Sequence, residues 1–524
     1  MRIDADRSAS SVTPPGGSIL MPTPVTANAP LGSALKSVVE TLGRRAALHP
    51  DRVALIAGPQ QVSYRELWER TLAAAQEFSR CGVSRGDRVL LSAPSVPAFS
   101  YGYFATHLLG AIAVVLDPNA PPTRRDELYS RTTPKLVIGD NPETHSGQCP
   151  FRSIADIDTL QRTGTVPALP KLDETADLMF TTGTTGRPKG VRLTHGNLAA
   201  AAFHINAVIE NGDQDVEVLP LPLNHSFGLG RLRCNLVAGG TVVLVDGFRL
   251  PGEIFSAIEK HRATGLVGVP AGFAVLLRFG ARGLGPFAHQ LQYVEIGSAP
   301  MPAEQKLALM ELLPTTRLWM HYGLTEASRS LFIEFHRHRE QLDSVGVAAP
   351  GVHLSVRRDD GSACNTGESG LLWIGGPHVA KGYWDDPDYD SRAFSGGYVC
   401  SGDIAHIGVN GYVYLHGRKD DMINVGGFNV SPDEIEQVLA LHPGVREAAC
   451  VGMPDPKNIS GHVLHAYLVR DSGHRQPADV ELSDWIRIRL EAYKIPIQYR
   501  WIESLPRTTS GKLMRATLRS RAST

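Results

Sequence analysis

Short apolar strand patterns alternate with amphipathic helical patterns along this chain, and this alternation limits the possible folds more than any other feature. The segment YRELWERTLAAAQEFSRCG places Leu67, Leu72 and Phe78 at helical spacing and ends at Gly82. The run AIAVVLD at 111–117 is apolar on both faces, as a strand in a parallel sheet covered by helices is. The same pattern returns in KLVIGD, TVVLVDGF, GLVGVP, YVEIGSAP and RLWMHYG. The chain is therefore predicted to be an α/β protein, with mostly parallel sheets flanked by helices.

The pattern changes after about residue 345. Segments rich in Gly and Asp, such as HLSVRRDDGSACNTGESGLLWIGG, predict a small antiparallel β part. Beyond Arg418 a small α+β unit is expected, with a helix that begins at Pro432 behind Ser431 as its N-cap. We therefore expect a large N-terminal domain over 31–419 and a small C-terminal domain over 420–524.

Composition excludes several classes of protein. A chain of 524 residues is too long for one compact core. Its formal net charge of −1 gives no support to a nucleic-acid or anionic-membrane partner. Residues 1–30 are expected to form a flexible tail and not a signal peptide, and no uninterrupted apolar run of membrane-spanning length occurs. The six scattered cysteines form no CxxC pair, which is typical of reduced thiols in a cytoplasmic protein.

The strongest local signal is LMFTTGTTGRPKG at 178–190, an expected strand followed by a loop rich in Gly and Thr. Its glycines permit close backbone approach, and its hydroxyl and N–H groups are donors suited to phosphate oxygens. The loop is not a Walker motif, because Lys189 follows a proline and not a glycine. A polar surface loop is the alternative interpretation.

Four ordered motifs then show a resemblance. TTGTTGRPKG, HYGLTEAS, the stretch from YVCSGDIA to SPDEIE, and PRTTSGKLMR are similar to segments of the adenylate-forming superfamily. That superfamily contains acyl- and aryl-CoA synthetases, adenylation domains and luciferases. The resemblance covers about residues 35 to 515, and the chain looks most like the acyl-CoA synthetases.

The resemblance implies a binding site for ATP. Tyr322 would lie on the adenine ring, Asp403 would accept hydrogen bonds from the ribose hydroxyls, and Arg418 would close the ribose side. Thr325 would contact the α-phosphate, and Glu326 would bind Mg²⁺, which prefers carboxylate oxygen. The other expected ATP-binding residues are Thr181, Thr182, Gly183, Thr184, Thr185, Gly186 and Lys189 at the phosphates, and Gly297, Ser298, Ala299, Pro300 and Gly323 beside the adenine.

The acyl pocket is less defined. By resemblance, His225 in LPLNHSFGLG borders it, with Phe203 and Arg231 as further candidates. If Arg231 faces the pocket, it can pair with a second carboxylate or a polar group of the substrate. A surface or interface arginine, and for His225 a packed core histidine, are the alternatives.

Lys512 lies near the C-terminus, far from the phosphate loop. Its compact charge and long stem suit a bridge between the carboxylate and the α-phosphate, where two anions must meet. The resemblance implies that the small domain turns about a hinge at Asp420 between two half-reactions. In the second orientation Gly427 would line the passage of a pantetheine arm, where a side chain would block it.

The expected function is ATP-dependent activation of a small-molecule carboxylic acid to an acyl adenylate with release of pyrophosphate, followed by transfer to a thiol. CoA is the expected acceptor, and the main alternative is the phosphopantetheine of a separate carrier protein, loaded by a stand-alone adenylation enzyme. A fatty-acyl-AMP ligase, a luciferase-type oxygenase and a non-catalytic relative are further alternatives. The sequence is compatible with a monomer or a homodimer.

Overall fold

A computed structural model describes residues 35–120, 122–140, 149–161, 167–182, 188–425, 428–455, 462–490, 492–508, 511 and 513–522. Its helices are α1 (Val38–Leu48), α2 (Tyr64–Arg80), α3 (Pro97–Leu108), α4 (Pro122–Thr132), α5 (Ile154–Thr159), α6 (His195–Ile209), α7 (Ser226–Ala238), α8 (Pro251–His261), α9 (Pro270–Leu277), α10 (Ala303–Leu312), α11 (Pro387–Ala393), α12 (Pro432–Ala440), α13 (Asp479–Arg487) and α14 (Arg515–Ala522).

The largest sheet has nine strands and a parallel centre. Its order is β15 (Val347–Ala348), β14 (Leu331–Glu334), β13 (Arg317–Tyr322), β12 (Tyr293–Ile296), β11 (Gly265–Gly268), β9 (Val216–Leu219), β10 (Thr241–Leu244), β1 (Val53–Ala57) and β2 (Gln60–Ser63). From β13 to β1 neighbouring strands are parallel, and the flanking strands are antiparallel. Strands β10, β11 and β12 are buried throughout, as their apolar sequences predict.

A second sheet has seven strands and carries the segment singled out at 178–190. Its order is β18 (Tyr383–Trp384), β8 (Pro188–Thr194), β7 (Thr175–Thr182), β4 (Ile112–Val115), β3 (Arg88–Ser92), β5 (Leu136–Gly139) and β6 (Phe151–Ser153). Strands β7 to β6 are parallel, whereas β8 turns back antiparallel beside β7 and β18 joins β8 in the same way.

The remaining sheets are smaller. The five-stranded antiparallel sheet contains β16 (His353–Arg357), β17 (Gly370–Gly375), β19 (Phe394–Ser395), β20 (Tyr398–Ile407) and β21 (Val413–Arg418). The C-terminal part contains β22 (Ile423–Val425), β23 (Phe428–Val430), β24 (Val445–Pro454), β25 (His462–Arg470) and β26 (Gln498–Trp501). Two hydrophobic clusters of the C-terminal part contain only residues from Ile423 onward.

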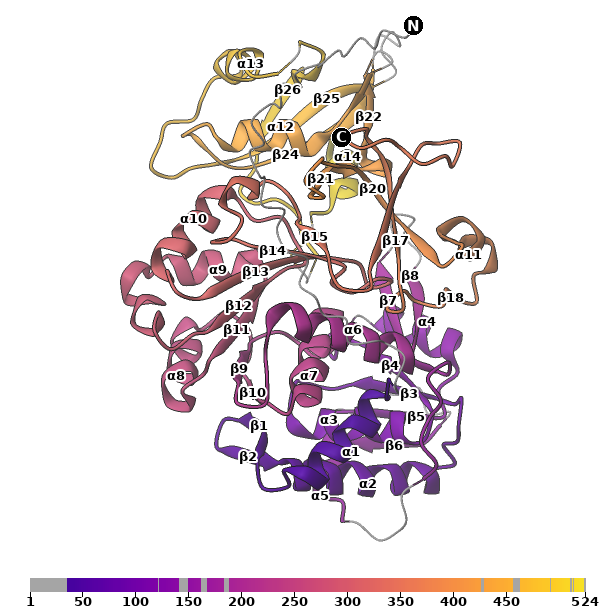
Figure 1. Ribbon diagram of the computed structural model, residues 1–524. Helices are drawn as coiled ribbons and strands as arrows, with labels where there is room; N and C mark the ends of the chain where they lie inside the picture. The colour runs from indigo at the N-terminus through magenta and orange to yellow at the C-terminus, as the bar shows by residue number, and fades with distance from the viewer. Residues whose placement is uncertain are drawn as a thin grey trace, which may run out of the picture. The chain divides into compact units, whose positions relative to one another are not determined.

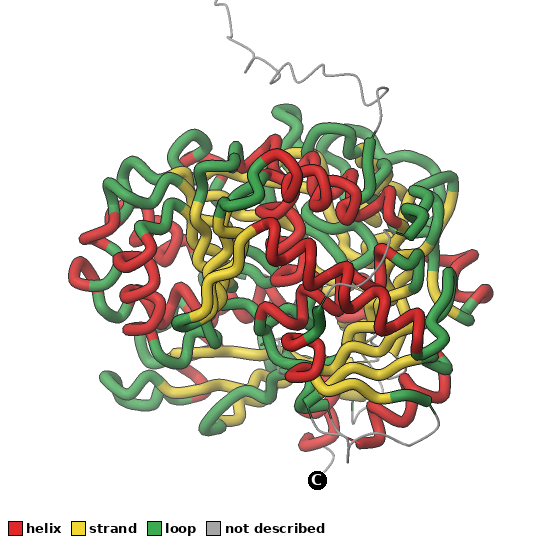
Figure 2. The backbone as a smooth tube through the Cα atoms, turned by 90° about the horizontal axis from the view of Figure 1, so that it is seen from below, coloured by secondary structure: helices red, strands yellow, loops and turns green. Residues whose placement is uncertain are grey.

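Helices cover both faces of the nine-stranded sheet. Figure 1 shows α8, α9 and α10 along one side of it, and α6 and α7 on the other side. Figure 2 shows the strands in separate groups with helices between them. One hydrophobic cluster joins residues of both large sheets through α1, α3 and α7.

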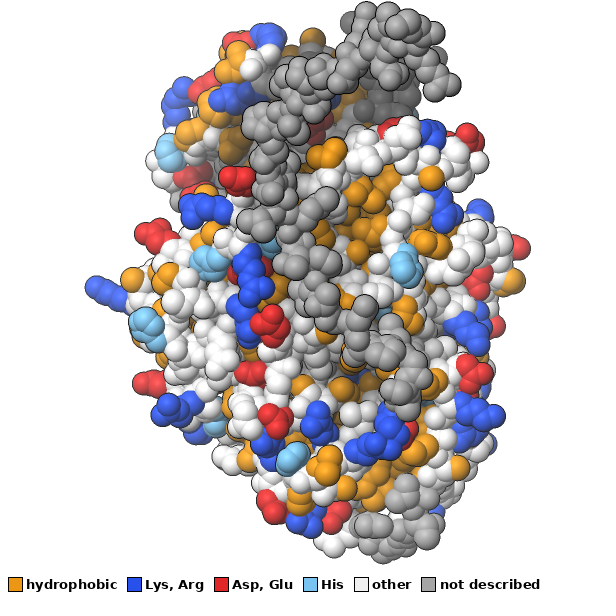
Figure 3. All heavy atoms as spheres, viewed as in Figure 1, with side chains coloured by type: hydrophobic (Ala, Val, Ile, Leu, Met, Phe, Trp, Pro, Cys, Tyr) orange, Lys and Arg blue, Asp and Glu red, His pale blue; other side chains and the backbone are white. Residues whose placement is uncertain are grey.

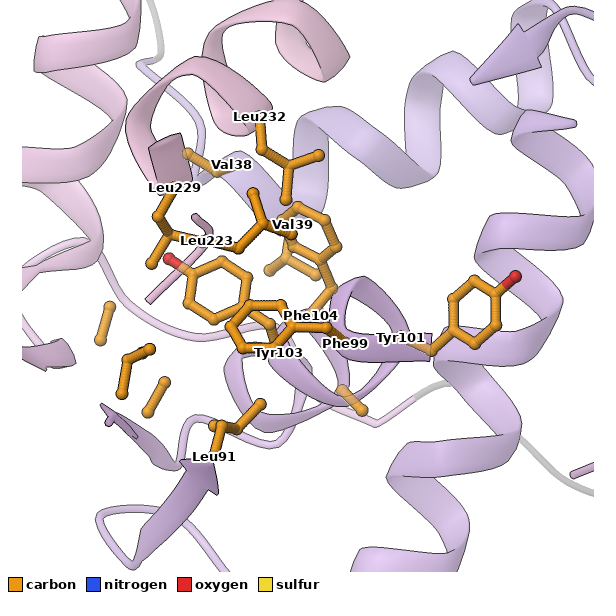
Figure 4. Close-up of a cluster of buried hydrophobic side chains, with 14 of the residues drawn as sticks. Val38, Val39, Leu91, Phe99, Tyr101, Tyr103, Phe104, Leu223, Leu229 and Leu232 are labelled. Carbon is orange, nitrogen blue, oxygen red and sulfur yellow. The ribbon is translucent and has the colours of Figure 1, made fainter. Parts of the chain in front are cut away.

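Helix α3 lies at the centre of that cluster, and every one of its residues is buried. In Figure 4, Phe99, Tyr103 and Phe104 of α3 lie among side chains of α1 and α7, whereas Tyr101 points to the opposite side. A helix that is apolar all round is expected only where neighbours cover it on every side.

The structure confirms the α/β pattern. Helix α2 begins behind Ser63, whose Oγ accepts the Glu66 N–H at 3.1 Å, and it ends before Gly82 as expected. Helix α12 begins at Pro432 as expected, but the Ser431 side chain makes no capping hydrogen bond. In the C-terminal part, α13 ends at Arg487 and a separate turn, Ala492–Lys494, follows.

The surface and the cysteines agree with the composition. On the face shown in Figure 3, positive and negative side chains are interspersed, as a near-neutral chain predicts. All six cysteines are free thiols. Among the described residues, no helix combines the length and the apolar character needed to cross a membrane.

Candidate active site

The end of β13 and the turn after it carry four of the expected site residues, Tyr322, Gly323, Thr325 and Glu326. Tyr322 ends β13, and Leu324 and Ala327 exchange backbone hydrogen bonds of 3.0 and 3.2 Å. These bonds close a tight loop with Thr325 and Glu326 at its tip. The strands on both sides belong to the nine-stranded sheet, so the loop projects from a rigid edge.

One end of this turn meets the five-stranded sheet. The Tyr322 hydroxyl donates a hydrogen bond to Oδ2 of Asp403, which lies on β20. Asp403 is paired in register with Arg418 of β21, whose Nη1 lies 3.3 Å from Oδ1 of the carboxylate. Arg418 also donates to the Ser401 carbonyl at 2.9 Å. The structure therefore brings together the three residues expected around adenosine, from segments far apart in the sequence.

Gly402 makes this arrangement possible. Its φ of +75° is unfavourable for other residues, and a Cβ there would lie 2.9 Å from Nη2 of Arg418. The Asp403 side chain is 11% exposed, so its charge is partly removed from water beside Arg418. Burial and the Asp403 carboxylate raise the pKa of Tyr322 well above its usual value, and the phenol therefore stays a donor at neutral pH.

The other end of the turn meets β18. The Tyr383 hydroxyl donates to Oε1 of Glu326 at 2.7 Å, and the Ala380 N–H donates to the Glu326 carbonyl at 2.8 Å. Burial and the Glu326 carboxylate raise the pKa of Tyr383. Tyr383 lies opposite Val191 of β8, so Glu326 is attached to the seven-stranded sheet.

Strands β7 and β8 form the hairpin that carries the expected phosphate loop. Thr181 pairs with Lys189 in register, and the loop between the strands, including Gly183, Thr184, Thr185 and Gly186, lies outside the described residues. The Lys189 ammonium lies 3.2 Å from the centre of the Tyr389 ring and 6.0 Å from that of Tyr383. The lysine is therefore held over aromatic faces by a cation–π contact.

A buried ionic network supports the β7 strand of this hairpin. Asp177 accepts hydrogen bonds from Tyr103 at 2.9 Å and from Arg233 at 3.0 Å, and it lies 2.8 Å from Nε2 of His107. Although burial opposes it, His107 and Arg233 keep the pKa of Asp177 below its usual value. The network fixes β7 against α3 and α7.

The expected adenine wall follows β12. Gly297 is buried, and a Cβ there would lie 2.0 Å from Nε2 of His321, so only glycine fits beside this ring. Ser298 has a φ of +73°, and Ser298, Ala299 and Pro300 are exposed. His321 precedes Tyr322, and its Nδ1 lies 2.7 Å from Oε1 of Glu295. The wall and the Tyr322 turn are thus joined through one histidine.

Glu295 is the centre of a second buried ionic network. Arg329 donates to it at 2.7 Å from Nε and to the Phe227 carbonyl at 2.8 Å from Nη2. Although burial opposes it, Arg329 and Arg231 keep the pKa of Glu295 well below its usual value. This carboxylate therefore connects β12, the segment after Glu326 and helix α7.

Arg231 belongs to this network, and the expectation that it contacts the acyl group needs correction. Its side chain is 0% exposed and pairs with Glu217 and, at 3.1 Å, with Glu295. Removing either partner would leave a buried uncompensated charge, so a structural role explains the arginine. Neither the pocket role nor the surface role describes this position.

The other two pocket candidates lie in different environments. His225 is the half-buried residue just before α7, and burial lowers its pKa. Phe203 on α6 is 43% exposed, which is the exposure of a surface side chain. His225 therefore remains a candidate for the acyl pocket, whereas the exposure of Phe203 gives that role little support.

Several expected site residues cannot be placed. Gly427 and Lys512 lie outside the described residues. Asp420 lies in a short turn, Lys419–Asp421, and only its backbone is described. The side chain of Thr182 is likewise not described.

Sequence reasoning did not find Tyr383, Tyr389 or Glu295. The two tyrosines lie in KGYWDDPDYD, where only the density of aromatic residues could have drawn notice. Glu295 interrupts the apolar strand YVEI, and a charge in a strand that is otherwise buried does indicate a buried ion pair. Its partners could not be identified from that signal.

Two family models match the chain. The model described as AMP-binding enzyme matches residues 42–384, and the model described as AMP-binding enzyme C-terminal domain matches residues 434–512. The chain belongs to the AMP-binding enzyme family. The large N-terminal and small C-terminal domains expected from the sequence are those of this family.

Similar proteins of this family are CoA ligases. The feruloyl-CoA synthase of Amycolatopsis sp is 32% identical over 91% of this chain and 97% of its own length. The 2-succinylbenzoate–CoA ligase of Bacillus subtilis (strain 168) is 31% identical over 91% and 97%.

Solved structures agree. The o-succinylbenzoate-CoA synthetase of Bacillus subtilis with its acyl-adenylate intermediate has a TM-score of 0.84 at 30% identity, over 91% of this chain and 97% of that one. ATP-bound MatB from Rhodopseudomonas palustris has a TM-score of 0.85 at 27% identity, over 93% and 99%. The expectations of an adenylate-forming enzyme, an α/β fold and an ATP-dependent acid–thiol ligase are confirmed.

Proposed function

We propose that this enzyme converts an aryl carboxylic acid to its acyl adenylate and then to its CoA thioester. The observation that carries the proposal is the short turn from Tyr322 to Glu326. Its first residue is bonded to Asp403 and its last to Tyr383, so one loop connects the adenosine side with the hairpin of the phosphate loop. A nucleotide bound along this turn meets an aromatic ring, a carboxylate for ribose and the phosphate-binding segment in order.

The residues of the chain would bind and orient ATP. Tyr322 offers its ring to adenine, and Asp403 with Arg418 offers acceptor and donor groups to the ribose. Thr325, half-buried in the turn, offers a hydroxyl to the α-phosphate. A carboxylate oxygen of the acid attacks the α-phosphorus, and the bond to pyrophosphate breaks.

Glu326 is the residue that would hold Mg²⁺. Among the described residues, no group of three or more His, Cys, Asp and Glu side chains is arranged for a metal ion. One carboxylate is sufficient for Mg²⁺, which usually binds through one or two carboxylates together with substrate phosphates. A bound Mg²⁺ would offset negative charge on the phosphates. Tyr383 keeps Glu326 oriented by its hydrogen bond.

Both half-reactions use the small C-terminal domain, and we place its boundary with the large domain at residue 420. We assign Lys512 to the first step, as the cation between the carboxylate and the α-phosphate. In the second step a thiol sulfur attacks the acyl carbon, and AMP leaves. Gly427 would line the path of the pantetheine arm.

Two comparisons support the choice of acid and acceptor. The feruloyl-CoA synthase and the 2-succinylbenzoate–CoA ligase both have names that specify an aromatic acid and CoA. A carrier-protein thiol is the main alternative acceptor. The chain also resembles the structure of the amide bond synthetase McbA from Marinactinospora thermotolerans, with a TM-score of 0.83 at 26% identity, over 93% of this chain and 99% of that one. An amine is therefore a third acceptor to test.

The test measures the two half-reactions separately. Carboxylate-dependent pyrophosphate release is measured over a panel of cinnamic, benzoic, dicarboxylic and fatty acids with ATP and Mg²⁺. Each active acid is then supplied with CoA, with a phosphopantetheinylated carrier protein or with an amine. We expect the highest kcat/KM with aryl acids and CoA, and loss of pyrophosphate release in Asp403→Ala.

Arg358→Gln is the matched control, because Arg358 pairs with Glu368 on an exposed loop. It should keep the activity of the unmodified enzyme. A preference for fatty acids, or transfer only to a carrier protein or an amine, would contradict the proposed substrate or acceptor. No pyrophosphate release with any acid would contradict the adenylating function itself.

A further inference from the structure

The described residues on the two sides of Lys512 pair with each other as the two sides of a narrow hairpin. The Met514 N–H donates to the Pro506 carbonyl at 2.9 Å, and Arg507 pairs with Leu513 in an antiparallel bridge. Arg507 also donates to the Gly511 carbonyl at 3.0 Å. Lys512 comes between Gly511 and Leu513 in the sequence, so the described residues on both sides of the lysine belong to this hairpin.

Two arginines anchor the two sides of the hairpin. On the first side, Arg507 donates to Oε2 of Glu447 on β24 at 2.7 Å, and these side chains are 45% and 34% exposed. On the second side, Arg515 begins α14 and is only 14% exposed. An exposed ion pair adds little to stability, so we expect Arg515 to be the stronger anchor.

Arg515 contacts three carboxylates. Its Nη2 donates to Asp433 and lies 2.8 Å from Oε2 and 2.9 Å from Oε1 of Glu436, both on α12. Its Nη1 lies 3.7 Å from Oδ2 of Asp421. Glu436 also accepts the Cys450 N–H at 2.7 Å, so this carboxylate is itself fixed.

The contact with Asp421 gives the arrangement its functional meaning. Asp421 ends the Lys419–Asp421 turn, where we place the hinge. Arg519, one turn further along α14, also approaches Asp421, with its Nη2 3.9 Å from Oδ1 of the carboxylate. The planar guanidinium of Arg515 can contact α12 and this turn at once, which the point charge of a lysine cannot do equally well.

We propose that Arg515 is a positioning residue that couples the hinge turn to the hairpin carrying Lys512. This inference rests on the proposed function of Lys512 in adenylation. When the small domain turns, Asp421 and the lysine hairpin then move as one rigid unit, so the hinge angle sets the position of the lysine. A lysine misplaced by about 1 Å is expected to slow adenylation, because attack on the α-phosphorus depends on close alignment.

The experiment uses full-length enzyme and three variants. Arg515→Lys keeps the charge but loses the planar fork, and Asp421→Asn removes only the hinge contact. Arg475→Met is the matched control, because Arg475 is 75% exposed and pairs with Glu481 of the same domain. We measure ATP–pyrophosphate exchange, thioester formation from supplied acyl adenylate, and hydrogen exchange of a peptide covering 506–514.

We expect kcat for pyrophosphate exchange to fall about tenfold to a hundredfold in Arg515→Lys, and less in Asp421→Asn. The KM for ATP and thioester formation from acyl adenylate should stay within about threefold, because neither uses the positioned lysine. Hydrogen exchange in the hairpin should be faster in Arg515→Lys, and Arg475→Met should match the unmodified enzyme.

Three results would overturn the proposal. Equal losses in both half-reactions would show a merely structural role, and unchanged pyrophosphate exchange in both test variants would show no role. An unchanged rate of hydrogen exchange in the hairpin would show that Arg515 does not anchor it. Absence of pyrophosphate exchange in the unmodified enzyme would instead contradict the proposed function, while the hydrogen-exchange comparison still tests the anchor.

Discussion

At the scale of single residues, Glu326 is oriented by a tyrosine 57 positions further along the chain. A carboxylate that must face phosphate and metal at one angle gains from such a partner, because a fixed donor limits its rotamers. Tyr383 also lies opposite Val191 of β8, so the same side chain links the metal candidate to the hairpin of the phosphate loop.

Tyr383→Phe should therefore lower kcat/KM for adenylation and raise the Mg²⁺ concentration needed for half-maximal rate. The ring stays in place while the hydrogen bond to Glu326 is lost, and removal of such an outer contact typically costs about tenfold in activity or metal affinity. Steady-state pyrophosphate release at increasing Mg²⁺ measures both effects.

Tyr389→Phe is the matched control for this prediction. It removes a hydroxyl from the neighbouring tyrosine but keeps the ring that Lys189 contacts at 3.2 Å. We expect it to behave like the unmodified enzyme. If Tyr383→Phe shows the same Mg²⁺ dependence as Tyr389→Phe, the orientation of Glu326 does not depend on Tyr383.

At the scale of elements, helix α6 makes a tertiary contact with the segment that follows the Tyr322–Glu326 turn. Nε2 of His204 lies 3.0 Å from the Arg329 carbonyl, and Nε2 of His378 lies 2.9 Å from the Ser330 hydroxyl. Burial lowers the pKa of His204 to about 4, and that of His378 to about 3. Both rings are therefore neutral in the folded protein at neutral pH.

These histidines predict a loss of stability in acid. In the unfolded chain a histidine binds a proton below its usual pKa of about 6.5, whereas His204 in the folded protein binds one only below about pH 4. Between these two pH values the unfolded state therefore holds more protons than the folded state. The contribution of His204 to the free energy of unfolding is complete above about pH 6.5 and decreases by about 3 kcal/mol at most as the pH falls to 4.

His204→Gln should flatten this pH dependence, because glutamine can donate to the Arg329 carbonyl but does not titrate in this range. Urea unfolding at several pH values between 4 and 7 measures the slope. His474→Gln is the control, since the His474 side chain is 54% exposed. Equal slopes in the two variants would contradict the assignment to His204.

At the scale of the whole molecule, the proposed mechanism separates two half-reactions between two domains. The side chains that we propose to bind the nucleotide lie at or before Arg418, whereas Lys512 belongs to the part matched by the C-terminal family model. A cation on a separate domain can act in adenylation and leave before the thiol enters, so that domain motion gates the chemistry.

Lys512→Ala should therefore lower acyl-adenylate formation by at least about a hundredfold, since a preorganised charge is lost where two anions meet. Thioester formation from supplied acyl adenylate should be nearly unchanged. Single-turnover assays of each half-reaction measure this difference. Normal carboxylate-dependent pyrophosphate release by the variant would exclude the proposed role.

The sequence alone determined the α/β class, the strand segments around β4, β5, β10, β11, β12 and β13, and the helices α2 and α12, because apolar periodicity and helix signals are local. It also determined the family, since four ordered motifs are a property of the chain and not of its folding. Tyr322, Asp403 and Arg418 were expected at one site through that resemblance, and the structure brings them together.

Only the tertiary structure decided the ionic partners. Arg231 looks the same in sequence whether it faces a substrate or a buried glutamate, and its partner Glu295 lies on β12, far from α7 in the sequence. The fold likewise decided that Tyr383 holds Glu326 and that Arg515 reaches Asp421. Such contacts depend on the packing of distant elements, and removing a charge from water is favourable only where that packing supplies a partner.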